Sequence, residues 1–355
     1  MTMIADTADD NRAPAQDQRK RGLAALLLKG AAFTSLTAGC VLAICVGVPD
    51  GNDYAKASVL KHSALNRDVP RKIVLVGGSN LAFGIDSTII RETTGCPVVN
   101  MGMNGYFGPK FMLSEARPNL RPGDVVVIAW EYDNYYKTIE GASDDLLMVT
   151  KANPNTFAYL DLSQIAGVIG RYPYVAQQKI LRLMTWARSM FKPKTKAAGP
   201  SIEEIESLAG FTKDGDLTSH LGVQWTEARE QGIDLVNTPP NRDIIPLMVD
   251  FVTDVEKRGV AVMISFTPVI RDFYATQRRE IDRVSAELSS NPKLKVPRPA
   301  SEFVFPSNQH FDTVYHLNAE GRGIRSRMLA DDILAQFGDR ARCGIQPLRT
   351  KKYHD

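Results

Sequence analysis

The stretch Lys72-Ile-Val-Leu-Val-Gly-Gly-Ser-Asn-Leu-Ala-Phe-Gly-Ile-Asp86 carries the pattern that decides the fold. Its apolar, β-branched run at 73–76 is typical of a strand buried on both faces in a parallel sheet. Two glycines end the run and permit a sharp turn and a close approach of the backbone. Ser79 follows at once, so its hydroxyl is expected at the carboxyl end of the strand, where open α/β sheets place their sites. A glycine-serine turn that only joins a strand to a helix is the alternative interpretation.

The rest of the chain continues this alternation of strands and helices. Asp86 is expected to cap a helix that ends near Thr94. Further strands are predicted at 96–100, 125–130, 260–266 and, weakly, 303–305, and further helices at 109–120, 241–258, 271–288 and 319–337. This pattern predicts an α/β domain with a mostly parallel sheet of about five strands.

A second block, Phe311-Asp-Thr-Val-Tyr-His-Leu-Asn-Ala-Glu-Gly-Arg322, lies more than two hundred residues after the serine. A hydroxyl is a weak nucleophile unless a base takes its proton, and that base needs an orienting acid. Asp312 and His316 lie just before a helix that Asn318 is expected to cap. The sequence therefore predicts Ser79 as nucleophile, His316 as base and Asp312 as orienting acid.

Together the two blocks resemble the SGNH (GDSL-type) hydrolase superfamily, in a variant similar to its membrane-anchored envelope members, the DltD-like and alginate-acetylation-like proteins. Members carry a Gly-Asp-Ser-like block after the first strand and an Asp-x-x-His block before the last helix. This chain has Gly78-Ser79-Asn80 in the first block. Three residues instead of two separate Asp312 from His316. The resemblance covers 70–135 and 240–338 and implies a flavodoxin-like three-layer sandwich.

The resemblance also implies which groups surround the oxyanion. A glycine after the second strand donates its backbone N–H in the superfamily, which makes Gly102 and Gly105 the candidates. Asn104 is expected to add a side-chain donor, and Gly78 and Asn80 flank the serine. A tight connection between strand and helix accounts for the two later glycines equally well.

After the strand at 125–130 the chain reads Glu131-Tyr-Asp-Asn-Tyr-Tyr136, where the superfamily has a Gly-x-Asn-Asp block whose asparagine completes the oxyanion hole. Asn134 is the candidate substitute for that asparagine. Glu131 is expected to face the site, and a helix-capping or salt-bridged carboxylate is the alternative.

The alternation of strands and helices lapses in an insertion at 137–240, which is too long for a plain loop. Helices are predicted at 157–169 and 174–191. The second is basic and amphipathic and suits either a bilayer or membrane partner, or a lid over the site. Asp216 and His220 resemble a segment of the envelope proteins and are expected to line the cleft, with an isolated surface turn as the alternative.

The amino-terminal segment predicts a membrane anchor. Residues 30–48 carry no charge and approach the length of about 20 residues that spans a bilayer. Arg19-Lys20-Arg21 precedes the apolar segment and predicts a cytoplasmic amino terminus, with the main domain in the periplasm. A cleavable signal peptide is the alternative.

The remaining composition restricts the function further. The net charge of +3 gives no reason to expect a nucleic-acid partner. No cysteine or histidine spacing suggests a metal site, and no cofactor is expected. Cys96 and Cys343 are hypothesised to pair in an oxidising compartment, whereas Cys40 and Cys45 fall in the apolar segment.

The sequence predicts a disordered cytoplasmic tail (1–21), an anchor (22–48), a linker (49–71), an SGNH-like α/β domain (72–338) with the insertion 137–240, and a carboxyl-terminal tail (339–355). The resemblance implies a serine esterase or O-acyltransferase acting on acetyl or similar groups of an exported polysaccharide or other envelope polymer. It also implies a membrane-bound O-acyltransferase as partner. A non-catalytic protein of the same fold, serving envelope assembly or carbohydrate binding, is the alternative.

Overall fold

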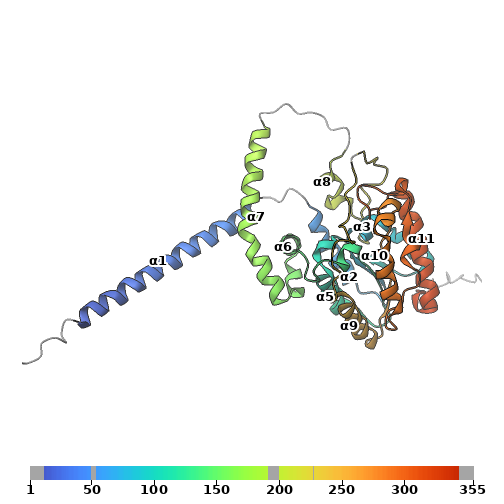
Figure 1. The fold of residues 1–355 in the computed structure, drawn as a ribbon, viewed down its shortest axis with the longest axis horizontal. Coiled ribbons are helices and arrows are strands. Elements are labelled where there is room, and N and C mark those ends of the chain that lie inside the picture. The colour runs from blue at the N-terminus through green and yellow to red at the C-terminus, as the bar shows by residue number, and fades with distance from the viewer. Residues whose placement is uncertain (1–11, 49–52, 191–199, 227, 344–355) are drawn as a thin grey trace, which may run out of the picture. The chain divides into compact units, whose positions relative to one another are not determined.

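A computed structural model describes residues 12–48, 53–190, 200–226 and 228–343. The chain divides into two compact units, one formed by 1–50 with 170–194 and the other by 51–169 with 195–355. The larger unit is an α/β domain built around a four-stranded parallel sheet (Figure 1). Its strands have the order β2-β1-β3-β4, with the bounds β1 (Ile73–Gly77), β2 (Val98–Asn100), β3 (Val125–Ala129) and β4 (Ala261–Ile264).

The weak strand predicted at 303–305 exists, but it does not belong to this sheet. As β6 (Val304–Phe305) it pairs with β5 (Val269–Ile270) in a separate two-stranded sheet. Two residues give too little pattern to reveal which partner a strand will take. The main sheet therefore has four strands among the described residues, where about five were expected.

Both faces of the sheet are buried, because every residue of β1 to β4 is inaccessible or nearly so. Side chains of alternate strand residues join those of α4 (Ser87–Thr94) and α11 (Ala319–Phe337) in one core. Two further helices, α5 (Pro109–Ala116) and α9 (Ile244–Lys257), pack against each other and against β1 and β4.

Helix capping matches the sequence at two of three places. Asp86 accepts a hydrogen bond from the backbone N–H of Thr88 at 3.0 Å and starts α4. Asn318 accepts from the N–H groups of two residues and starts α11. The helix predicted at 241–258 begins instead at Ile244 as α9 and has no side-chain cap, while Asn241 Nδ2 donates to the Lys137 carbonyl.

The insertion is helical, but its helices differ from those predicted, and α6 (Ser143–Ala152) and α8 (Ile202–Ile205) were not expected. The two helices predicted there form a single helix, α7 (Leu162–Ser189), with Pro173 inside it. Proline removes one backbone hydrogen bond, and here that loss does not end the helix. The other helices of the domain are α2 (Ala57–Leu65), α3 (Ser79–Gly84) and α10 (Arg271–Ser290).

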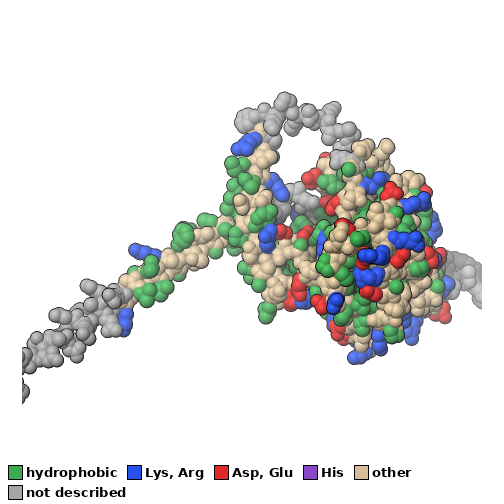
Figure 2. Space-filling view, in the orientation of Figure 1, with side chains coloured by type: hydrophobic (Ala, Val, Ile, Leu, Met, Phe, Trp, Pro, Cys, Tyr) green, Lys and Arg blue, Asp and Glu red, His purple; other side chains and the backbone are tan. Residues whose placement is uncertain are grey.

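The smaller unit contains one long apolar helix, α1 (Arg12–Gly47). Its part Lys20–Gly47 is long and apolar enough to cross a membrane, and Figure 2 shows hydrophobic side chains along it. The helix includes residues 12–21, which composition had placed in a disordered tail. The remainder of that predicted tail lies outside the described residues.

A disulfide joins Cys96 to Cys343, with Cα atoms 4.7 Å apart, as hypothesised. Cys96 precedes β2 and Cys343 follows α11, so the bond ties the end of the last helix to the sheet. Residues 339–343 thus belong to the folded domain, and the rest of the predicted carboxyl-terminal tail lies outside the described residues. Cys40 and Cys45 are free thiols.

Candidate active site

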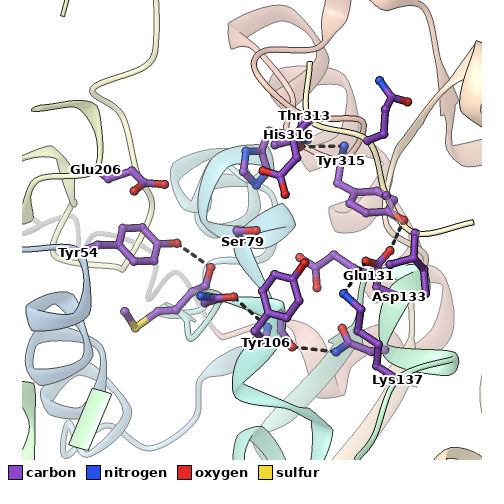
Figure 3. Close-up of a pocket in the computed structure, with 18 of the residues that line it drawn as sticks. Tyr54, Ser79, Tyr106, Glu131, Asp133, Lys137, Glu206, Thr313, Tyr315 and His316 are labelled. Carbon is purple, nitrogen blue, oxygen red and sulfur yellow. Dashed lines mark hydrogen bonds and ion pairs between the residues drawn. The ribbon is translucent and has the colours of Figure 1, made fainter. Parts of the chain in front are cut away.

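A cavity of about 380 Å³ opens beside the carboxyl ends of β1 and β3 (Figure 3). It brings together Ser79, which follows β1, Glu131, which follows β3, and His316 from the loop before α11. The other lining residues are Tyr54, Met103, Asn104, Gly105, Tyr106, Asp133, Asn134, Lys137, Met148, Glu206, Glu230, Gln231, Gly232, Ile233, Thr313 and Tyr315.

Ser79 is the first residue of α3, immediately after the two glycines that end β1. Neither glycine has a positive φ angle, so the backbone conformation does not require glycine here. Close packing does. A Cβ atom on Gly77 would lie 2.2 Å from the Ala129 carbonyl oxygen, and one on Gly78 would lie 2.2 Å from Glu131 Oε2. The Ser79 hydroxyl makes no hydrogen bond to any described residue and faces the cavity.

His316 and Asp312 form a hydrogen-bonded pair, with 2.7 Å between Nδ1 and Asp312 Oδ1. The Thr313 hydroxyl accepts hydrogen bonds from the backbone N–H groups of Tyr315 and His316, at 3.1 and 3.0 Å. The resulting tight turn accommodates the additional residue between acid and base. The longer Asp-His spacing is therefore compatible with a direct contact.

The contact shifts the pKa values of the two side chains in opposite directions, as an acid and a base that act together require. Burial acts to raise the pKa of Asp312, but the charge and hydrogen bond of His316, together with a backbone hydrogen bond and His220, leave it below its usual range. Burial acts to lower the pKa of His316, whereas the charge and hydrogen bond of Asp312 leave it above the usual range. Asp312 is thus held ionised and stabilises a protonated imidazole.

The imidazole is also fixed by an aromatic contact. It stacks on Phe83 with ring centroids 3.9 Å apart and planes inclined by 4°. Phe83 lies on α3, one turn after Ser79, so the same short helix carries the nucleophile and the platform for the base. In Figure 3 the imidazole lies above the Ser79 side chain, with both directed into the cavity.

Glu131 occupies the position next to the serine turn, and its side chain is buried. Its Oε1 accepts hydrogen bonds from the backbone N–H of Asn80 at 2.9 Å and from Asn80 Nδ2 at 2.8 Å. Its Oε2 is buried and lacks a hydrogen-bond partner among the described residues. Glu131 lines the cavity, the position in which it was expected.

The predicted oxyanion donors are mostly engaged elsewhere. The N–H of Gly102 donates to Asn100 Oδ1 at 3.0 Å, and Gly102 does not line the cavity. Asn104 Nδ2 donates to Asp145, and Asn134 Nδ2 donates to the carbonyl of Gly105. Asn104, Gly105 and Asn134 nevertheless line the cavity, so of these four residues the structure brings three to the site.

Asp216 and His220 do not line this cavity. The Asp216 carboxylate is buried and accepts hydrogen bonds from Ser87, Asn100 and Arg322. His220 is buried against Phe83, and burial lowers its pKa to about 3. Both residues are therefore buried in the interior of the domain. Their hydrogen bonds connect segments that are distant from each other in the sequence.

Sequence reasoning missed much of the cavity wall. Tyr315 donates to Asp133 Oδ1 at 2.7 Å, and Asp133 also forms an ion pair with Lys137. Tyr54 comes from the segment predicted as a linker, and Glu206 and Glu230 from the insertion. Glu230 is held there by the base loop, since its N–H donates to the Asp312 carbonyl at 2.8 Å. Tyr315 and Asp133 stand in two of the blocks quoted from the sequence but had no role assigned to them, whereas Tyr54, Glu206 and Glu230 lie in no recognisable motif.

No group of three or more His, Cys, Asp or Glu side chains suited to a metal ion occurs in the described part of the chain. No protein-family model matches this sequence, and no curated protein matches it either.

Proposed function

We propose that this protein is a serine esterase or O-acyltransferase of the SGNH type. Ser79 Oγ would attack the acyl carbonyl carbon while His316 accepts the hydroxyl proton. The imidazolium would give that proton to the departing alkoxide, leaving an acyl-serine. Water or a sugar hydroxyl would then attack the acyl-serine, lose its proton to His316, and release the hydroxyl of Ser79.

One observation carries the proposal: Ser79 lines the same cavity as an imidazole whose Nδ1 is hydrogen-bonded to a carboxylate at 2.7 Å. That bond directs the remaining nitrogen of His316 as the proton acceptor. The parallel sheet with the order β2-β1-β3-β4 also supports a flavodoxin-like sandwich, the fold of this superfamily.

The cavity wall supports a carbohydrate as the group that carries or receives the acyl chain. Tyr54 and Tyr106 provide aromatic surfaces, and Glu206 and Glu230 provide hydrogen-bond acceptors for sugar hydroxyls. An acetyl or similar group on an exported polysaccharide or envelope polymer fits this wall. The length and apolar character of α1 support anchoring in a membrane. The basic residues Arg19, Lys20 and Arg21 before its apolar part are the reason to propose the cytoplasmic membrane with the α/β domain in the periplasm, and a membrane-bound O-acyltransferase would be the partner.

A second candidate function, carbohydrate binding or envelope assembly without catalysis, is favoured by one observation. The amide donors around the serine turn are engaged internally, and a buried carboxylate stands beside the nucleophile. Both features weaken the stabilisation of an oxyanion, which is worth about 10²–10³ in rate per donor.

The two functions differ in their reaction with a fluorophosphonate probe. We expect the full-length protein in detergent to be labelled, Ser79→Ala to lose all labelling, and His316→Ala to lose most of it. Ser307→Ala, which alters an exposed serine outside the cavity, is the matched control and should label normally. A folded wild-type protein that stays unlabelled would favour the binding function.

A further inference from the structure

The second half of α7, residues 170–190, belongs to the same compact unit as the apolar helix α1. We refer to it as the 170–190 segment. It is joined to the carboxyl-terminal end of α1 by side-chain hydrogen bonds. Lys179 Nζ donates to the Cys45 carbonyl at 2.8 Å and to the Val48 carbonyl, and the Cys45 thiol donates to the Tyr172 carbonyl at 3.4 Å.

These contacts place the segment at one end of the helix suited to cross a membrane. These contacts bury Lys179, and its ammonium group interacts favourably with the last carbonyl groups of α1. The candidate membrane-spanning part of α1 ends at Gly47, beside the same carbonyls. A bilayer crossed by α1 would therefore have one of its surfaces at the level of the 170–190 segment.

Beyond Lys179 the segment exposes large apolar side chains. Ile180, Leu183 and Met184 are 43, 44 and 47% exposed, and all three lie within one broad face of the helix. Gln178, Arg182 and Thr185 form a polar stripe on the other side, at spacings of four and three residues. Figure 2 shows the hydrophobic side chains gathered on this segment.

The charged residues in and around the 170–190 segment are all basic. Between Asp161 and Glu203 the sequence has no acidic residue, whereas seven Lys and Arg residues occur at 171, 179, 182, 188, 192, 194 and 196. A helix with an apolar face and only basic charged residues is typical of helices that lie in the headgroup region of an anionic bilayer.

We propose that the 170–190 segment lies in the interface of the bilayer that α1 spans, with Ile180, Leu183 and Met184 among the acyl chains and Arg182 among the phosphates. The lipid surface is the occupant because the segment is continuous with the end of the membrane-spanning helix and matches anionic headgroups in charge. This inference rests on the anchoring described under the proposed function. It makes the 170–190 segment a second attachment of the chain to the membrane.

Site-specific labels on the full chain test this placement. In a Cys40→Ala, Cys45→Ala background, an environment-sensitive dye is attached at Ile180→Cys or Met184→Cys on the apolar face. The matched controls are Gln178→Cys and Arg182→Cys on the polar stripe. Each protein is inserted into phosphatidylcholine vesicles containing phosphatidylglycerol, with and without dibrominated acyl chains. A further label at Leu36→Cys reports on α1.

We expect brominated lipid to quench the labels at 180 and 184 about twofold or more relative to those at 178 and 182, because an interfacial helix buries only its apolar face. Aqueous iodide should show the opposite order. Quenching at 36 together with iodide-accessible labels at 180 and 184 would overturn this inference and leave the anchor intact. Labels at 180 and 184 shielded from both quenchers would overturn it in favour of a protein cover, either a lid or a partner. Absence of quenching at 36 would overturn the anchor as well.

Discussion

At the scale of single residues, the contact between Gly78 and Glu131 defines the wall beside the nucleophile. The two residues follow different strands, and the carboxylate occupies the space that any side chain at position 78 would need. Asn80 holds the carboxylate in place with two hydrogen bonds. The geometry of the serine turn therefore depends on a residue fifty positions away.

Gly78→Ala tests this dependence. The new methyl group would overlap the buried carboxylate, so we expect the free energy of unfolding to fall by about 1–3 kcal/mol. Combining Gly78→Ala with Glu131→Ala removes the overlap and should recover part of the loss, measured as a coupling free energy in a double-mutant cycle of urea denaturations. Gly323→Ala, inside α11, is the control and should be neutral or stabilising, because its Cβ would make only ordinary contacts with the Arg327 side chain, at 3.6 Å or more. Independent, additive effects of the first two changes would contradict the contact.

The His316–Asp312 pair predicts a pH dependence. A general base must be neutral, so labelling by the fluorophosphonate should rise with pH as His316 loses its proton. Because Asp312 raises the pKa of His316, the wild-type rise should lie above the ordinary histidine value of about 6.5.

In Asp312→Asn that rise should move to lower pH, and the plateau rate should fall about 10²-fold or more. The rate constant of labelling between pH 5 and 9 measures both effects, and thermal unfolding confirms that the variant is folded. A profile that stays in place would show that Asp312 does not orient the base.

Much of this site could be predicted at the residue scale, because the reacting groups have chemical identities that stand out. Ser79 after a glycine pair and His316 near an acid were proposed from their residue types together with the resemblance of the two blocks to those of a known superfamily. Asp216 and His220 look similar in the sequence, and only the folded structure shows that they do not line the cavity. Glu206 and Tyr54 could not be predicted, because an isolated acid or tyrosine carries no periodic signal.

At the scale of elements, the Cys96–Cys343 disulfide connects the region of β2 with the end of α11. Both partners contact the main core, and the backbone N–H of Cys343 donates to the Thr94 carbonyl at 3.1 Å. The bond closes a loop of 247 residues, which restricts the unfolded chain strongly.

Removing the disulfide should therefore destabilise the domain. We expect Cys96→Ser with Cys343→Ser to lower the free energy of unfolding by about 2–5 kcal/mol. Reducing agent should have a similar effect on the melting temperature of the wild type and none on the double variant. Cys40→Ala, which removes a free and exposed thiol, should not change the stability. A wild type unaffected by reductant would show that the bond does not form in solution.

The helices and strands also show which features of the fold a sequence pattern does not predict. Long periodic helices such as α11 and the apolar runs of β1, β3 and β4 were predicted within a few residues. The two-residue strands β5 and β6 were not assigned to their own sheet, because their pairing depends on the tertiary arrangement. Gly170 and Pro173 indicated a break in α7, but the flanking residues continue the helix across it.

At the scale of the whole molecule, the chain combines an α/β domain that holds the candidate site with a unit that contains a helix suited to cross a membrane. The composition of residues 22–48 was sufficient to predict a helix long and apolar enough to cross a membrane. The association of the 170–190 segment with that helix was not predictable, because it depends on Lys179 reaching carbonyl groups more than 130 positions earlier.

The disulfide has a practical consequence for handling the protein. The cavity opens beside the carboxyl ends of β1 and β3, whereas Cys343 is fastened near the amino end of β2, at the opposite edge of a parallel sheet. A purification tag or a tether to a sensor chip fused directly after Cys343 would thus start from the far side of the domain. Immobilised in this way, the protein should keep its cavity open to large polymers.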